Sequence, residues 1–356
     1  MAKLTPKAAP APESAGAYFT QPSERLLFLP TGCTTLNCAL GGGWVFGRMG
    51  NIIGDKSTAK TGLAIEACAN FIRMFPKEVA RYREAEGAFE EGYAAAMGMP
   101  VDNVRFWKDD YGDRPFETIE DLFEDLDAVL DATGDSPSLY IVDSLDALSD
   151  REEMARKLSN RDSEGTKEKA GSYSLGKQKK LGELFRRLIR RIEASRMCLL
   201  IISQVRDNIG VSFGEKHKRT GGKSMDFYAS HALWLSHMET VKRKVKGVER
   251  AVGIRIKAKC KKNKVGFPFR ESEFEYIFGY GIDDLAASLE WLMSVKRLPA
   301  LLGKEATVEE AKAFLKATER LPDAEYHAAV ADVSLIVKQV WSEIETSFLP
   351  VRRKYG

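Results

Sequence analysis

Short apolar runs that end at a polar or charged residue recur along the middle of the chain. Three of them have the length and composition of buried strands, at residues 48–53, 138–143 and 197–202. A run of four to eight apolar residues next to turn-forming segments is typical of a strand inside a sheet. The second run ends at Asp143, and the third ends at Ser203 and Gln204. The pattern therefore predicts buried strands with polar residues at their ends.

In other segments apolar residues recur every three or four positions, which is the period of an amphipathic helix. One predicted helix has an apolar stripe of Ile119, Leu122, Phe123, Leu126, Val129 and Leu130. A second, over 177–191, buries Leu181, Leu184, Phe185, Leu188 and Ile192 and places its cations on the other side. Further helices are predicted over 285–295, after the capping box Thr307–Glu310, and over 326–348. We expect Trp291 and Trp341 to be core residues of this C-terminal region, where the sequence indicates no chemistry.

The segment after the first predicted strand has the pattern of a phosphate-binding loop. It stands between that strand and a helical stretch over 62–71, which is the context the motif requires. In such a loop backbone N–H groups bind phosphate oxygens, Lys60 neutralises the outer phosphates and Thr61 holds Mg²⁺. Ala59 replaces the usual second glycine, and we expect its Cβ to be tolerated only in an ordinary region of φ/ψ space. The candidate phosphate-binding residues are Gly54, Asp55, Lys56, Ser57, Thr58, Ala59, Lys60, Thr61 and Gly62.

Two further strand ends carry candidate chemistry. Asp143 is suited to a metal-bound water at the carboxyl end of a parallel strand, and the alternative is an ordinary turn-forming Asp. Gln204 precedes a segment, reaching Ser230, with four glycines and five basic residues. Loops of this length are usually functional or disordered. An amide followed by a basic, glycine-rich loop is suited to sensing one ligand and binding a polyanion. The alternative is a flexible, solvent-exposed loop without a binding function.

The charge distribution favours nucleic acid more than the net charge does. The 356 residues carry a net charge of only +3. Residues 109–135 nevertheless include eleven acidic residues, and residues 216–264 include fifteen Lys or Arg against three acidic residues. The sequence therefore predicts one strongly negative and one strongly positive surface, and phosphate backbones bind the latter with release of counterions.

Composition excludes several other classes. A hydrophobic fraction of 44% is globular, and the length allows one large core domain with a small satellite. No run approaches the roughly 20 apolar residues of a membrane span, and the N-terminus lacks the apolar core of a signal peptide. Five cysteines without metal-ligand spacing predict reduced thiols in a cytosol. The four histidines form no ligand cluster.

In this order and spacing, the segments resemble the RecA family of recombinases over residues 30–284. The similarity rests on Thr31–Gly32 with 36–43 and 47–48, on 83–94, on 209–214 with 220–222, and on 259–264 with 267–270. It implies an α/β fold: a RecA-type P-loop ATPase core with a mostly parallel central sheet flanked by helices, plus a small C-terminal helical region. The implied cofactors are ATP and Mg²⁺, with Thr61 and Asp143 at the metal.

The resemblance also assigns roles to individual residues. It implies that Glu86 activates the attacking water, that Lys60 and Gln204 complete the catalytic set, and that Gln204 senses the γ-phosphate. Tyr93 is expected to stack on adenine beside Glu90. Lys262 and Lys264 are expected to contact the nucleotide bound to the neighbouring subunit. The implied DNA-binding residues are Lys179, Arg186, Arg206, Asn208, Ile209, Gly210, Phe213, Gly221, Gly222 and Lys223.

The function implied is an ATP-dependent DNA recombinase, a DNA-dependent ATPase that forms helical filaments on single-stranded DNA and pairs it with homologous duplex DNA. The expected partners are these DNAs, other copies of the chain, and single-strand-binding and loading proteins in a bacterial cytosol, with no membrane. Two alternatives stay open: a RecA-fold motor of another class, such as a hexameric helicase-like ATPase, and a weakly hydrolysing recombination mediator. The Phe213 loop and the paired lysines oppose the first, whereas Ala59 and Lys56 favour the second.

Departures from the family pattern shape the predicted organisation. We expect a flexible arm over 1–24 with a docking patch at Ala17–Phe19, an ATPase core over 25–284, and C-terminal helices over 285–356. DNA-binding loops are expected near 150–176 and 205–226. The first of these loops and the basic C-terminus diverge from bacterial members, which favours a bacteriophage or plasmid-borne origin.

Overall fold

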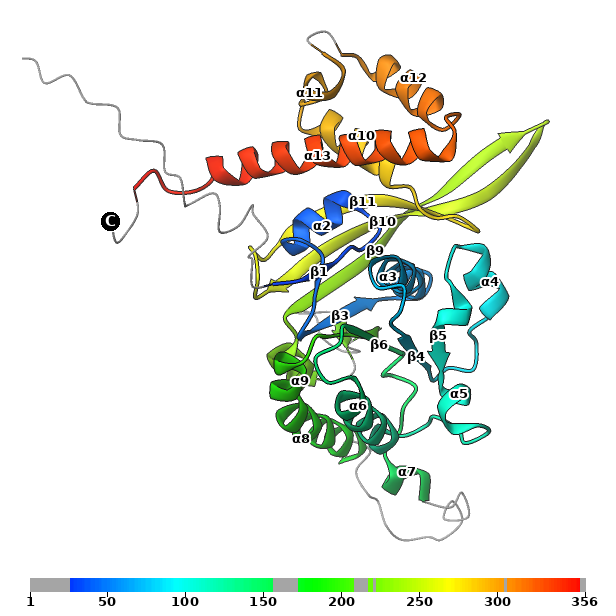
Figure 1. The fold of residues 1–356 in the computed structure, drawn as a ribbon, viewed down its shortest axis with the longest axis vertical. Helices are drawn as coiled ribbons and strands as arrows, with labels where there is room; N and C mark the ends of the chain where they lie inside the picture. The colour runs from blue at the N-terminus through cyan, green and yellow to red at the C-terminus, as the bar shows by residue number, and fades with distance from the viewer. Residues whose placement is uncertain (1–25, 156–171, 208–216, 220–221, 304–305, 353–356) are drawn as a thin grey trace, which may run out of the picture.

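The computed structural model describes residues 26–155, 172–207, 217–219, 222–303 and 306–352. Its centre is a sheet of ten strands in the order β12-β11-β10-β9-β3-β7-β6-β4-β5, with β8 paired to β7 (Figure 1). The strands are β3 (Arg48–Gly54), β4 (Ala80–Glu84), β5 (Val104–Phe106), β6 (Ser138–Asp143), β7 (Met197–Asp207), β8 (His217–Arg219), β9 (His231–Val245), β10 (Val248–Asn263), β11 (Arg270–Ile277) and β12 (Gly281–Ile282). A separate two-stranded sheet pairs β1 (Phe28–Leu29) with β2 (Trp44–Val45).

Strand direction divides the large sheet into two parts. Strands β9, β3, β7, β6, β4 and β5 pair in parallel, whereas β10, β11 and β12 add antiparallel pairs at one edge. The three predicted strands are β3, β6 and β7, which lie next to one another and are almost wholly buried up to Gln204. Their carboxyl ends meet at one edge, where α/β sheets bind ligands. The sheet is therefore α/β as predicted, and mixed because of its antiparallel edge.

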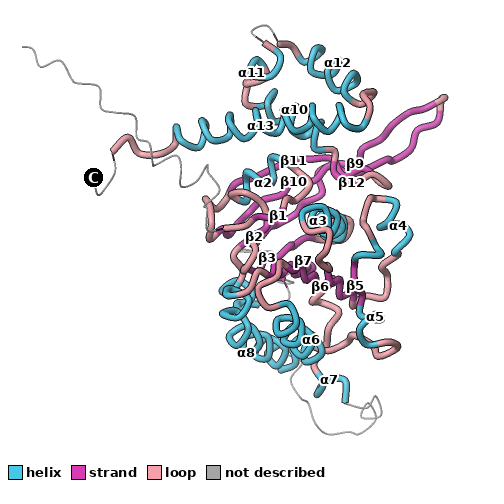
Figure 2. Tube along the Cα trace, in the orientation of Figure 1, coloured by secondary structure: helices cyan, strands magenta, loops and turns pink. Residues whose placement is uncertain are grey.

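Helices cover both faces of this sheet (Figure 2). One face packs against α2 (Thr34–Leu40), α3 (Lys60–Met74) and α4 (Glu91–Ala96), in a core that includes Leu36, Leu63 and Phe71. The other packs against α5 (Trp107–Tyr111), α6 (Ile119–Thr133), α8 (Ser172–Ala194) and α9 (Gly222–Tyr228). Two short elements, η1 (Val101–Asn103) and α7 (Arg151–Ala155), lie in the connections. The predicted apolar stripes of α6 and α8 are buried here, except that Phe123 is partly exposed.

The C-terminal helices form a third apolar cluster of their own. They are α10 (Asp284–Ser294), α11 (Pro299–Leu302), α12 (Val308–Thr318) and α13 (Asp323–Ser347), and the sequence did not predict α11. The indole rings of Trp291 and Trp341 stack with centroids 5.3 Å apart. Helix α13 crosses above α2 (Figure 1), and Arg270 donates to the Glu345 carboxylate at 2.7 and 2.5 Å. This helical cluster is therefore attached to the α/β core by specific polar contacts.

Two expectations about the chain after Gln204 were wrong. Strand β7 does not end there but continues to Asp207, because its last three residues pair with β8. Regular structure also resumes before Phe227, since α9 begins at Gly222. The loop is thus shorter than the sequence indicated.

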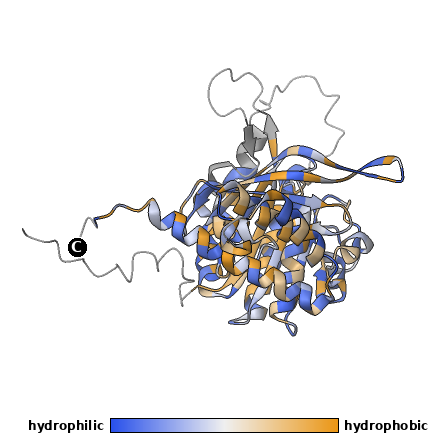
Figure 3. Ribbon diagram, turned by 90° about the horizontal axis from the view of Figure 1, so that it is seen from above, coloured by the Kyte–Doolittle hydropathy of each residue, from blue (hydrophilic) through white to orange (hydrophobic). Residues whose placement is uncertain are grey.

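A long hairpin was not predicted from the sequence. Strands β9 and β10 are joined by Lys246 and Gly247, both with positive φ (49° and 82°), as a two-residue hairpin turn requires. The outer half projects from the body of the molecule (Figure 3) and is largely exposed. Its polar residues replace the apolar alternation that marks a strand, which is why the pattern was missed.

Candidate nucleotide site

The phosphate-binding loop connects buried strand β3 to helix α3. Gly54 ends β3, and a Cβ at this position would lie 2.3 Å from Thr58 Oγ1, so the close turn requires glycine. Within the loop Thr58 Oγ1 donates to the Asp55 carbonyl at 2.8 Å, and Lys60 Nζ donates to the same carbonyl at 2.6 Å. The first N–H groups of α3 point toward the loop without helical partners, as at any helix N-terminus. These donors are the ones that a phosphate group uses.

Ala59 departs from the expectation for its backbone. It precedes α3 with φ 58° and ψ 29°, the left-handed region, and Ser57 also has a positive φ of 55°. The expectation that a Cβ is tolerated here only in an ordinary region of φ/ψ space was wrong, because Ala59 takes the left-handed, glycine-like conformation in the turn into α3. A Cβ in this region costs about 1–2 kcal/mol. The loop is therefore strained at a residue beside the phosphate site.

Asp143 is the centre of a buried polar cluster at the end of β6. Its side chain is buried, and Oδ2 accepts hydrogen bonds from Thr61 Oγ1 at 2.8 Å and from the Tyr82 hydroxyl at 2.6 Å. Burial raises the pKa of Asp143, although these two donors act in the opposite direction. Burial also shifts the pKa of Lys60, in this case downward, whereas the negative charges of Asp143 and Glu86 act to raise it. Carboxylate and hydroxyl oxygens are the ligands that Mg²⁺ prefers, so Asp143 and Thr61 fit the ion.

Glu86 lies in a turn that its neighbour Glu84 holds. The Glu84 carboxylate accepts hydrogen bonds from the backbone N–H groups of Glu86, Gly87 and Ala88, at 2.8, 3.0 and 3.1 Å. The Glu86 Oε1 atom in turn accepts from Ser144 Oγ at 2.5 Å and from Gln204 Nε2 at 2.9 Å. The segments just after β4 and β6 and residue Gln204 of β7 thus meet at one carboxylate.

A cavity of about 440 Å³ joins these groups. Its polar lining comes from the phosphate loop, Glu86, Asp143 and Gln204. Its apolar and aromatic lining comes from Ile65, Tyr93, Met97, Ile254, Tyr276 and Phe278. Phosphate-binding groups and aromatic side chains in one cavity match the two parts of a nucleotide. Sequence reasoning found Tyr93 but missed the residues from β10 and β11 and the segment after them, because nothing in their local pattern places them beside the loop.

Glu90 lies differently from the expectation, whereas the assignment of Lys262 and Lys264 to a neighbouring subunit's nucleotide stays a prediction. Glu90 is not among the residues that line the cavity, and its carboxylate caps α4 by accepting from the Gly92 N–H at 3.2 Å. Lys262 and Lys264 donate to the Phe227 carbonyl at 3.0 and 3.1 Å, and neither lines the cavity of its own chain. These two lysines therefore lie outside the nucleotide cavity of their own chain.

The RecA N-terminal domain model matches residues 20–283. The chain belongs to the RecA family. It is 34% identical over 267 residues to Protein RecA of Prochlorococcus marinus (strain NATL1A), covering 75% of this chain and 64% of that protein. For Protein RecA of Synechocystis sp. the identity is 33%, with 75% and 68% covered. For that of Synechococcus sp. (strain WH7803) it is 33%, with 75% and 63% covered.

These findings confirm the predicted family and α/β fold. This RecA-family chain spans about 64% of the length of the first relatives it matches, and the match ends before the C-terminal helices. A bacteriophage or plasmid origin stays a prediction.

The predicted DNA-binding residues are only partly described. Lys179 and Arg186 are exposed on α8. Arg206 lies in β7, and Gly222 and Lys223 lie in the first turn of α9. Asn208, Ile209, Gly210, Phe213 and Gly221 fall outside the described residues, as do the N-terminal arm with Ala17–Phe19 and most of the first loop.

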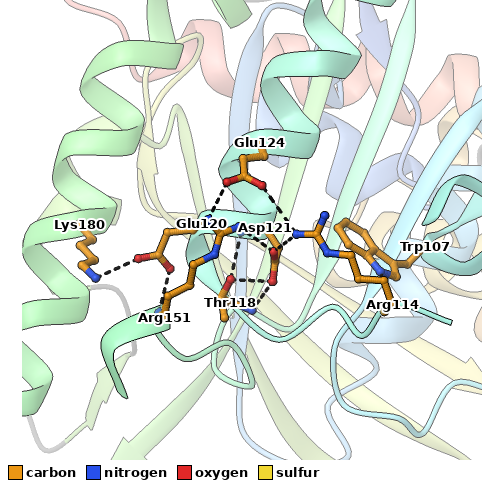
Figure 4. Close-up of polar contacts among 8 residues, drawn as sticks. All are labelled: Trp107, Arg114, Thr118, Glu120, Asp121, Glu124, Arg151 and Lys180. Carbon is orange, nitrogen blue, oxygen red and sulfur yellow. Dashed lines mark hydrogen bonds and ion pairs between the residues drawn. The ribbon is translucent and has the colours of Figure 1, made fainter. Parts of the chain in front are cut away.

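The acidic segment is less negative than its composition indicated (Figure 4). Asp121 of α6 pairs with Arg114 and with Arg151, the latter at 3.0 Å. Glu120 pairs with Lys180 at 2.9 Å, and Glu124 pairs with Arg151 at 2.7 Å. The prediction of a strongly negative surface was wrong in this respect, because cations from α7 and α8 neutralise much of α6.

Among the described residues, no group of three His, Cys, Asp or Glu side chains forms a metal site, and all five cysteines are free thiols. No helix in the described part of the chain could cross a membrane.

Proposed function

We propose that this chain is an ATP-dependent DNA recombinase: a DNA-dependent ATPase that polymerises on single-stranded DNA and promotes pairing with a homologous duplex. One observation carries the proposal. The Glu86 carboxylate is hydrogen bonded to Gln204, and Gln204 lies on the strand that continues into the basic segment. The group assigned to hydrolysis and the strand assigned to DNA binding are therefore in direct contact.

The phosphates of ATP would bind at the N-terminus of α3, where the loop N–H groups and Lys60 provide positive charge. Thr61 and Asp143 would hold Mg²⁺, which supplies charge neutralisation for the phosphates when bound. Adenine would lie in the cavity against Tyr93, whose side chain is 46% exposed. Glu86 would accept the proton of the attacking water, with Ser144 fixing its orientation.

Lys262 and Lys264 are assigned to the nucleotide of a neighbouring subunit. Their ammonium groups bind carbonyl oxygens at the end of α9 and are separate from the cavity of their own chain. Two cations that stand outside their own site suit a site completed in trans. The ATP site would then form the interface between copies in a filament.

DNA would bind where β7 leads into the basic segment. Gln204 donates to Glu86 through its side chain, and its backbone N–H donates to Asp146 at 2.7 Å. A γ-phosphate would compete with Glu86 for the Gln204 amide, and a shift of Gln204 would be transmitted along β7 to Arg206. The exposed cations Lys179 and Arg186 of α8 are assigned to the phosphate backbone.

The test is ATP hydrolysis with and without single-stranded DNA, together with electron microscopy of the complex with a non-hydrolysable ATP analogue. The proposal expects DNA-stimulated hydrolysis, lost in Lys60→Ala, and an open helix on the DNA. A closed ring would instead assign the chain to a helicase-like motor.

The second candidate is a mediator that binds ATP and DNA but hydrolyses slowly, and the left-handed backbone at Ala59 favours it. Tight DNA binding without stimulated hydrolysis would support the mediator and overturn the ATPase proposal.

A further inference from the structure

Tyr82 is a buried side chain whose hydroxyl reaches the candidate metal carboxylate. It lies on β4 with no exposed surface and donates to Asp143 Oδ2 at 2.6 Å. Its ring packs against Phe89, with centroids 4.6 Å apart, and against Phe106, at 6.1 Å. Close packing leaves such a ring in one rotamer, so the position of the hydroxyl is fixed by the core.

Asp143 has little other reason to keep one orientation. The terminal torsion of an Asp side chain is soft, and its carboxyl plane turns at low energetic cost. The second donor to Oδ2 is Thr61, which is itself assigned to the metal. When Thr61 turns its hydroxyl oxygen toward an ion, the Tyr82 hydroxyl is the donor from the protein core that still holds Asp143. Parallel pairing of β4 with β6 places the two strands side by side and makes this contact possible.

We infer that Tyr82 is a positioning residue that orients Asp143 for the divalent cation bound with the nucleotide. The inference rests on the proposed function, since it requires the cavity to bind ATP with Mg²⁺. Side chains that hydrogen bond to metal-binding groups set ligand orientation, and their loss typically lowers metal affinity about 10- to 100-fold. Tyr82 does not touch the substrate in this account and acts only through Asp143.

The chain offers a matched control in Tyr140. This residue lies on β6, is equally buried, and donates its hydroxyl to Asp125 Oδ2 at 2.5 Å. Asp125 belongs to a cluster with Arg83, which donates to it at 2.6 Å, on the face of the sheet that packs against α6. Tyr82→Phe and Tyr140→Phe therefore remove the same atom from the same kind of buried pair, and only one pair is near the nucleotide.

The experiment is a Mg²⁺ titration of the binding of a fluorescent ATP analogue to the full chain. For Tyr82→Phe we expect the Mg²⁺ concentration at half-maximal tight binding to rise about tenfold, while affinity in EDTA stays that of the parent. Tyr140→Phe should follow the parent curve. Both variants should lose similar thermal stability.

An unchanged titration for Tyr82→Phe, or an equal shift in both variants, would overturn the inference. If Tyr82→Phe is too unstable to assay, the double-mutant cycle of Tyr82→Phe and Asp143→Asn is measured at low temperature. The inference expects Tyr82→Phe to cause no further loss of Mg²⁺ dependence when Asp143→Asn is present. Additive losses would contradict it. A parent chain whose nucleotide binding ignores Mg²⁺ would instead overturn the proposed function itself.

Discussion

Replacement of Ala59 by glycine tests whether the phosphate loop is strained. Ala59 stands in the left-handed region immediately before α3, where a Cβ costs about 1–2 kcal/mol. The substitution removes that cost but also raises the entropy of the unfolded chain, by about 0.4–1 kcal/mol. It further removes a half-buried methyl group that packs against the core. We therefore expect Ala59→Gly to change the free energy of unfolding little, or to raise it slightly.

The strain appears clearly in comparison with Ala128→Gly. Ala128 is exposed in the middle of α6, where glycine costs about 1 kcal/mol relative to alanine. The unfolded-state term is common to both substitutions, so the difference between the variants approximates the strain at Ala59, about 1–2 kcal/mol. With a urea m-value of about 3 kcal/mol/M, the midpoints of the two variants should differ by roughly 0.3–0.7 M.

The assay is urea unfolding followed by far-UV circular dichroism for the parent and both variants, with equal m-values as the requirement for comparison. A loss of about 1 kcal/mol in both variants would refute the reasoning. It would mean that the loop accommodates the Ala59 Cβ at no energetic cost, and that the left-handed conformation of Ala59 does not destabilise the folded state.

Other residues give shorter tests. Glu86→Gln should keep nucleotide affinity and abolish hydrolysis in a single-turnover assay, because the group that takes the water proton is lost. Normal turnover would mean that another residue takes this proton. Glu84 is a poor substitute, because its carboxylate already accepts hydrogen bonds from three backbone N–H groups. Lys262→Ala and Lys264→Ala should lower DNA-dependent hydrolysis but leave nucleotide affinity of isolated monomers unchanged, whereas equal losses in monomer and filament would put both lysines in their own subunit's site. Gln204→Ala should retain ATP binding but bind DNA equally well in the ATP and ADP states, whereas the parent should bind DNA about 1–3 kcal/mol more tightly in the ATP state. DNA affinities measured at fixed salt, with ADP and with a non-hydrolysable ATP analogue, test this. A variant that still binds DNA more tightly in the ATP state would contradict the role of Gln204 in coupling the two sites.

Local pattern was enough to predict the parts of this molecule that are continuous in sequence. The strands β3, β6 and β7, the helices α6 and α8, and the phosphate loop all lie where periodicity and motif placed them, although β7 and α8 extend beyond their predicted bounds. The hairpin of β9 and β10 was missed because its outer half contacts solvent on both faces, so no apolar alternation marks it.

Features that depend on distant contacts were beyond the sequence. Tyr82 appears as an ordinary core residue until parallel pairing brings β4 beside β6 and Asp143. Tyr276 lines the cavity only because β11 brings its ring next to α3, where it occupies the space beside Gly62. The ion pairs of α6 depend on where α7 and α8 pack, and composition alone cannot supply that.

The contacts of the C-terminal helices bear on how this chain can be divided. Similarity to the family model ends at residue 283, yet Asp284 accepts hydrogen bonds from the Thr34 N–H at 2.5 Å and from its hydroxyl at 2.8 Å. Thr34 begins α2, so the first turn of a core helix receives its acceptor from a residue just past the family boundary. Ser334 of α13 lies 2.8 Å from the same hydroxyl. The end of the family-model match therefore does not separate the C-terminal helices from the rest of the chain, because residues beyond position 283 hydrogen bond to the first residue of α2.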